Sequence, residues 1–208
     1  MVPLHRHEPR EAGEVTRRSA LLPVGALAVA LVGAPTATAD APPGVTAPPS
    51  GVAVTAARFA PPGQATSAYT YDTALVPAGA AVLVVATPKH RSTKVLLSVH
   101  GLVPNRTYGA HAHQRPCGDL PTDAGAHHQH VVDPVQPSVD PAYANPENEI
   151  WLDFTTDDRG RAVVGTAVPW RFADRRAGSV VIHAERTATE PGRAGTAGPR
   201  LACATVRF

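Results

Sequence analysis

Short segments in which apolar and polar residues alternate, separated by turn signals, recur from residue 69 to the end of the chain. In Thr93–His100 the side chains of Val95, Leu97 and Val99 share one face, which is the period of a half-buried strand. No ten-residue helical pattern occurs, and 17 glycines with 22 prolines disfavour long helices. The segments expected as strands are Tyr69–Val76, Ala80–Thr87, Thr93–His100, Tyr108–His113, Glu149–Thr156, Ala162–Val168, Ser179–His183 and Leu201–Phe208. This spacing predicts an all-β fold, an eight-stranded antiparallel sandwich or barrel.

Two stretches are too irregular to be strands. Residues 114–148 are rich in Pro, His and Asp, and residues 185–199 are rich in Gly and Thr. Long loops in a compact domain are usually functional or disordered. The first stretch carries one cysteine and three histidines, which favours a structured loop that holds a metal ion.

The first 39 residues have the pattern of an export signal. Two arginines in Thr16–Ser19 precede an apolar run over residues 20–32, and Ala37–Ala39 is an A-x-A cleavage site. The arginine pair is similar to a twin-arginine signal, although Sec signals also carry adjacent arginines. The run is short for a membrane span. We therefore expect a secreted, extracytoplasmic bacterial protein whose mature chain has no stable membrane span; a retained signal anchor is the alternative.

Residues 40–66 contain three Pro-Pro pairs without a strand or helix period, as is typical of a linker. Residues 51–59 are apolar enough to form a first strand instead, which leaves the boundary open. We place the folded domain at residues 67–208.

Six of the ten histidines lie between positions 111 and 183. His111 and His113 form an H-x-H pair on an expected strand, where alternation points both imidazoles toward one ion. His183 ends the apolar run Val180–Ile182, where an unpaired buried imidazole would be costly. Copper or zinc binding would explain the pattern, because imidazole is their commonest ligand. The alternative is a loop of solvated histidines with one satisfied core histidine.

The chain has two cysteines, Cys117 and Cys203. An even count in an exported chain is most simply read as one disulfide. Two independent free thiols are the alternative.

Four segments carry motifs that occur in the same order in a known family. The segments are Tyr108–His113 after Gly101-Leu102, similar to G-L…G-F-H-V-H; Ala124–His127, similar to A-G-P-H; Ser179–His183, similar to V-V-H; and Gly195–Cys203, similar to G-N-A-G-S-R-L-A-C. From about residue 93 to the end, the chain thus resembles the copper/zinc superoxide dismutase family, which has a Greek-key β-barrel. The last motif is the most diagnostic, because it places an arginine three residues before a cysteine near the C-terminus.

The resemblance implies roles for individual residues. It implies that copper is bound by His111, His113, His127 and His183. It also implies a disulfide between Cys117 and Cys203, with Arg200 beside the copper ion. In the family, His127 would be shared with zinc and would carry a proton to the product, so the expected catalytic residues are Arg200 and His127.

The zinc side departs from the family pattern. After His127 the next histidines are only His128 and His130, and the family's H-x-G-D pair is matched by His130 and Asp133, much closer to His127 than usual. Two interpretations stay open. Either His127, His130 and Asp133 form a compact zinc site, with or without His128, or zinc is absent and a carboxylate such as Glu149 or Asp133 supports His127. We expect the first.

The expected function is dismutation of superoxide to dioxygen and hydrogen peroxide at the copper centre, in extracytoplasmic oxidative-stress defence. A copper-binding or buffering protein without turnover and a structural β-domain with incidental histidines are the alternatives. A net charge of +2 without a cluster of lysine and arginine argues against a nucleic-acid partner. Residues 185–199 carry few charges, so attraction of superoxide would depend mainly on Arg200. The strands do not indicate an oligomeric state.

Overall fold

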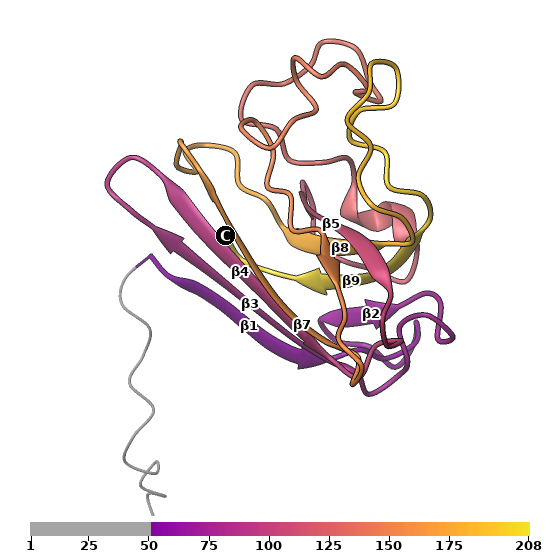
Figure 1. Ribbon diagram of the computed structural model, residues 1–208. Coiled ribbons are helices and arrows are strands. Elements are labelled where there is room, and N and C mark those ends of the chain that lie inside the picture. Colours follow the sequence, from indigo (N-terminus) through magenta and orange to yellow (C-terminus); the bar gives the residue numbers. More distant parts are fainter. Residues whose placement is uncertain (1–50) are drawn as a thin grey trace, which may run out of the picture. The chain divides into compact units, whose positions relative to one another are not determined.

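The computed structural model describes residues 51–208, which form two antiparallel β-sheets (Figure 1). Sheet A consists, in spatial order, of β1 (Ala53–Arg58), β3 (Ala81–Pro88), β4 (Thr93–His100) and β7 (Arg161–Val168). Sheet B consists, in spatial order, of β2 (Ala68–Thr70), β9 (Arg200–Thr205), β8 (Ser179–His183), β5 (Thr107–His113) and β6 (Phe154–Thr155). A short 3₁₀ turn, η1 (Pro121–Ala124), lies in the loop after β5. The expected all-β antiparallel class is confirmed, as a sandwich of two separate sheets.

Alternation along the strands builds the core between the sheets. On β4 the side chains of Val95, Leu97 and Val99 are buried, as expected. They belong to one continuous apolar cluster with Ala110 and Ala112 of β5 from the facing sheet. The inner faces of the two sheets form this core, and their outer faces point away from it. The outer face of sheet B can therefore carry polar side chains.

Three strands differ from expectation. Residues 53–58, within the stretch where both a linker and a first strand were considered, form β1 at the edge of sheet A. The strand expected over residues 69–76 ends at Thr70, because the Asp72 carboxylate accepts the amides of Ala74 and Leu75 and turns the chain. The strand expected over residues 149–156 is reduced to β6. The Asp153 carboxylate accepts the amide of Ala110 in β5, which would donate to a backbone carbonyl in a regular strand pair.

One disulfide, Cys117–Cys203, joins the loop after β5 to β9 across 86 residues of sequence. The expected pairing is therefore confirmed. The export signal predicted for residues 1–39 and the first part of the predicted linker lie outside the described residues. Within residues 51–208, no helix is long and apolar enough to cross a membrane.

Candidate metal centre

Four histidines converge on the outer face of sheet B. His111 and His113 come from β5, His183 from the end of β8, and His127 from the loop after η1. One ring nitrogen of each lies within 4.8 Å of one nitrogen of every other. The structure thus gathers all four residues that the sequence proposed as copper ligands.

Strand alternation explains the positions of His111 and His113. Ala112, between them, faces the core, so both rings project to the outer side of sheet B beneath the long loops. The segment carrying His127 returns alongside β5, where the amide of His128 donates to the Ala112 carbonyl at 2.9 Å. This backbone pairing places the His127 ring over the H-x-H pair, with ring centroids 4.1 Å from His111.

The loop after β8 closes over the site because β5 has a glycine where the loop crosses. A Cβ at Gly109 would lie 2.5 Å from the carbonyl oxygen of Glu185 and 2.8 Å from the Cβ of Ala197. Both distances are far below ordinary contact, so only glycine allows this close approach.

In both His113 and His183, one ring nitrogen donates a hydrogen bond to a backbone carbonyl outside the cluster, and the other nitrogen is free. His113 Nδ1 lies 3.0 Å from the carbonyl oxygen of Gly125, and His183 Nδ1 lies 3.2 Å from that of Gly198. A carbonyl oxygen only accepts, so both Nδ1 atoms carry the proton. The two Nε2 atoms are therefore unprotonated on neutral rings, and they lie 3.3 Å apart.

His111 is oriented by a two-step hydrogen-bond chain. The Thr187 hydroxyl donates to the Asp153 carboxylate at 2.6 Å, so its oxygen accepts from His111 Nε2–H, also at 2.6 Å. The other nitrogen, His111 Nδ1, is fully buried without a hydrogen-bond partner. An orphaned, unprotonated nitrogen on one ring of the four-histidine group is the arrangement expected of a metal ligand.

His127 is held by a buried carboxylate. Its Nδ1 donates to Glu149 Oε2 at 2.8 Å, and the same oxygen accepts the indole N–H of Trp151 at 2.7 Å. The second oxygen, Oε1, accepts the Gln129 amide at 2.8 Å. Three donors compensate the desolvation of this carboxylate, which is 1% exposed. The Nε2 of His127 stays free for an ion.

Burial keeps the three innermost rings neutral. Desolvation, reinforced by the neighbouring His127 ring, lowers the pKa of His111 and of His113 well below the ordinary 6.5. The same two causes lower the pKa of His183 to about 3, against the opposing hydrogen bond to Gly198. Neutral imidazole is the form that binds metals.

Arg200 lies at the rim of the cluster. Its guanidinium donates to the carbonyl oxygens of Pro121 at 2.8 Å and Gly125 at 2.7 Å. It borders a cavity of about 400 Å³ together with His127 and His183. Two of its five N–H groups are engaged by these carbonyls, so the others are available to an anion in the cavity.

The zinc set expected from the sequence, His127, His130 and Asp133, is not brought together in the described part of the chain. The His130 ring stacks flat on Trp170, with centroids 5.0 Å apart. The Asp133 carboxylate accepts hydrogen bonds within its own loop, including the Ser138 hydroxyl at 2.7 Å. The nitrogen of His127 that a shared zinc ion would need donates to Glu149 instead.

His128 is not a ligand of the cluster either. Its ring packs against Trp170 and Phe172, with centroids 5.9 and 5.0 Å away. Burial, aided by the nearby Arg175, lowers its pKa to about 4. His128 is therefore a neutral packing residue in the described structure.

The sequence reasoning missed Asp153, Thr187, Trp151 and Gln129, and offered Glu149 only in its second interpretation. A signal for three of these residues was present. In residues 149–154, Ile150, Leu152 and Phe154 are buried in the core. Strand alternation therefore turns the intervening Glu149, Trp151 and Asp153 toward the histidines.

No protein-family model and no curated protein matches the chain. Among solved structures it is similar to a "Cu/Zn superoxide dismutase from Brucella abortus", at 16% identity and a TM-score of 0.48. The match covers 74% of this chain and 99% of that one. Such a distant likeness does not assign a family.

Proposed function

We propose that this protein is a copper-dependent superoxide dismutase, with His111, His113, His127 and His183 as the copper ligands. One observation carries the proposal. Each of the four imidazoles has one nitrogen fixed by a hydrogen bond to a surrounding residue and the other free within the cluster. That division of roles is how proteins set the tautomer and orientation of metal-bound histidines.

The donor set fits copper. Four neutral imidazoles suit both oxidation states of copper, and no carboxylate or thiolate lies in the group. When bound, copper would supply one-electron cycling, so that one superoxide is oxidised to dioxygen and the next is reduced to hydrogen peroxide. The motifs around the four histidines, which resemble the copper/zinc superoxide dismutase family, favour copper over zinc as this ion.

Arg200 would attract and orient the substrate. Its guanidinium keeps its charge at every relevant pH, and the two carbonyl contacts hold it at the rim of the cavity. A small anion entering beside His127 and His183 would meet the remaining N–H donors. A fixed positive charge at a cavity mouth raises the encounter rate with an anion.

His127 would provide the proton for the peroxide product. Its Nδ1 proton is held by Glu149, so Nε2, the nitrogen that would bind copper, is also the one that would take up and release a proton whenever it does not hold the ion. It is the most exposed of the four rings, with 18% of its side chain accessible, and it borders the cavity. His111 and His113 are fully buried, and His183, which also borders the cavity, is only 5% exposed.

A shared zinc ion does not fit the residues present. Glu149 engages His127 Nδ1, and His130 and Asp133 have other partners. We therefore propose that the Glu149 carboxylate, rather than zinc, orients His127. The disulfide is compatible with an extracytoplasmic location, where such bonds persist.

The test is metal analysis and superoxide decay measured on the same copper-loaded chain. We expect one copper per chain, no stoichiometric zinc, and accelerated decay of superoxide. Bound copper without accelerated decay would instead indicate a copper-buffering protein, and failure to retain copper would refute the metal centre itself.

A further inference from the structure

The outer face of sheet A is unusually apolar for a surface turned away from the core. Alternation assigns to this face Val54, Ala56 and Arg58 of β1, Ala81, Leu83, Val85 and Thr87 of β3, Lys94, Leu96, Ser98 and His100 of β4, and Arg161, Val163, Gly165 and Ala167 of β7. None of these positions is acidic. In an antiparallel sheet with one covered face, the other face is normally polar, so this composition requires an explanation.

The apolar side chains form a continuous band across all four strands. The strand register aligns Val54, Val85, Leu96 and Gly165 in one row, and Ala56, Leu83, Ser98 and Val163 in the next. Among the larger side chains, Val54 is 50% exposed, Leu96 38% and Val163 70%. Seven of these eight aligned positions are apolar, and Ser98 is the exception.

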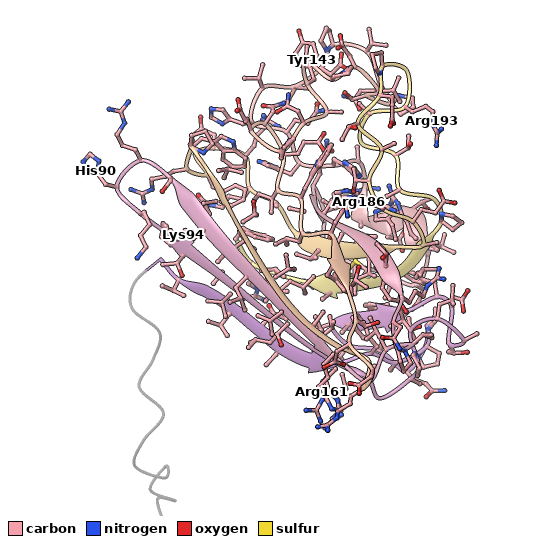
Figure 2. The ribbon with its side chains drawn as sticks, viewed as in Figure 1. His90, Lys94, Tyr143, Arg161, Arg186 and Arg193 are labelled. Carbon is pink, nitrogen blue, oxygen red and sulfur yellow. A yellow bond between two sulfur atoms is a disulfide. The ribbon has the colours of Figure 1, made fainter. Side chains whose placement is uncertain are left out.

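Cations border the band at both ends of the strands. Lys94 lies at one end, next to the β3–β4 hairpin tip with Lys89 and Arg91, whereas Arg58 and Arg161 lie in one row at the other end. Figure 2 shows Lys94 and Arg161 at opposite ends of the sheet. The two ends are roughly 20 Å apart, from the rise per residue along a strand.

None of these cations forms a side-chain salt bridge within the described part of the chain. The ion pairs found in residues 51–208 involve only His111 and His127. Asp157 and Asp158 lie in the turn that precedes β7, which makes the Lys94 end the more cationic of the two.

A second copy of this chain is a poor partner for this face. Two copies related by a two-fold axis along the strands would place Lys94 opposite Lys94. An axis across the strands would place Lys94 opposite His100 at the other end of β4, with Arg161 on the neighbouring strand. Like charges would oppose each other in either arrangement, which disfavours a face-to-face dimer.

We propose that the outer face of sheet A docks onto an anionic phospholipid bilayer. The partner must be apolar opposite the central rows and anionic at both ends, 20 Å apart. A bilayer interface offers both features, because phosphate headgroups can meet the cations while the acyl boundary meets the valines and Leu96. An extended acidic peptide would cover a single row, leaving the rest of the apolar band exposed.

Partitioning of the full chain into vesicles is the first test. Vesicles of phosphatidylglycerol and phosphatidylcholine in equal parts are compared with vesicles of pure phosphatidylcholine by co-sedimentation. Partitioning should require phosphatidylglycerol and fall with added salt. Each cation lost from the face should weaken it roughly fivefold, and Val163→Asp should weaken it on the order of tenfold.

Matched variants locate the contact. Val135 is 71% exposed and Val163 is 70% exposed, but Val135 lies in the loop after β5, away from this face. Val135→Asp is therefore the control for Val163→Asp. Arg193→Glu, in the loop after β8, is the control for Lys94→Glu. Circular dichroism checks that every variant is folded. Equal losses in control and test variants would overturn the proposal.

A local probe separates this face from any other membrane contact of the chain. An environment-sensitive fluorophore attached at Val163→Cys should shift to shorter wavelength with anionic vesicles, and the same probe at Val135→Cys should not. No shift at position 163 would overturn the proposal even if the chain sediments with vesicles. So would a dimer in solution that Val163→Asp converts to a monomer, because the face would then be a self-association surface.

Discussion

His127 and Glu149 are joined by a hydrogen bond of 2.8 Å between Nδ1 and Oε2, in the position where the sequence resemblance led us to expect a zinc ion. The carboxylate is itself fixed by Trp151 and Gln129. An ionised carboxylate can only accept, so this network keeps the His127 proton on Nδ1. Groups of the protein itself therefore determine which nitrogen of His127 is unprotonated, and no second metal ion is needed for this.

Replacing Glu149 with glutamine should separate activity from copper content. Glutamine has nearly the same shape but only one acceptor oxygen, so it leaves one of the three N–H donors without a partner. We expect copper to be retained and the rate of superoxide decay to fall about 10- to 100-fold. Metal analysis and superoxide decay on the same sample measure both. Glu147→Gln, at an exposed carboxylate two residues earlier, should leave both unchanged, and an unaffected Glu149→Gln rate would contradict the assigned role.

Replacing His183 with alanine should remove copper and activity together. His183 supplies a free Nε2 within 3.3 Å of that of His113, and the shorter side chain leaves the cluster one ligand short. Copper per chain, measured after dialysis against a chelator, is expected to drop well below one. His90→Ala, in the exposed β3–β4 hairpin (Figure 2), is the control and should bind copper normally. A fully loaded and active His183→Ala chain would rule out His183 as a ligand.

The framework of the site was predictable because it follows the period of strands. The alternation that buries Val95 and Leu97 in β4 also places His111 and His113 on one face of β5. His183 could be recognised because it ends an apolar run. In each case, the residues that matter lie within one strand, where side-chain direction follows directly from sequence position.

The residues that orient the histidines were harder to predict. Asp153 and Thr187 are 34 positions apart and meet only when the loop after β8 crosses β5 at Gly109. Contacts between loops also explain why His130 and Asp133 do not join the four-histidine group. His130 and Asp133 are close to His127 in sequence, but the His130 ring stacks on Trp170, which comes from another loop. Proximity in sequence does not reveal such a contact. Contacts between loops do not follow a periodic sequence pattern, so the sequence does not predict them.

Replacing Arg200 with alanine should reduce the rate without removing copper. The guanidinium is held at the cavity rim by Pro121 and Gly125 and lies outside the four-histidine group. We expect the rate of superoxide decay to fall and its dependence on ionic strength to flatten, because the charge that attracts the anion is lost. Decay rates across a salt series, for equal copper content, measure this effect. Arg193→Ala should keep the salt dependence, and loss of copper in Arg200→Ala would point to a structural role instead.

The metal-free chain should lose stability as the pH falls from 7 toward 4. The folded-state pKa values of His111, His113 and His183 lie below 6.5, so in this range the unfolded chain binds protons that the folded chain cannot. Stability is therefore full above pH 6.5 and declines below it, by about 2 kcal/mol at pH 5 for His183, whose folded pKa is about 3, with further losses of the same sign from His111 and His113. Urea unfolding of the metal-free chain at several pH values measures the slope. In His183→Ala, the slope of stability against pH should correspond to one proton fewer taken up on unfolding. Replacing the exposed His90 should leave the slope unchanged. A stability independent of pH between 7 and 5 would show that the rings are not buried as described.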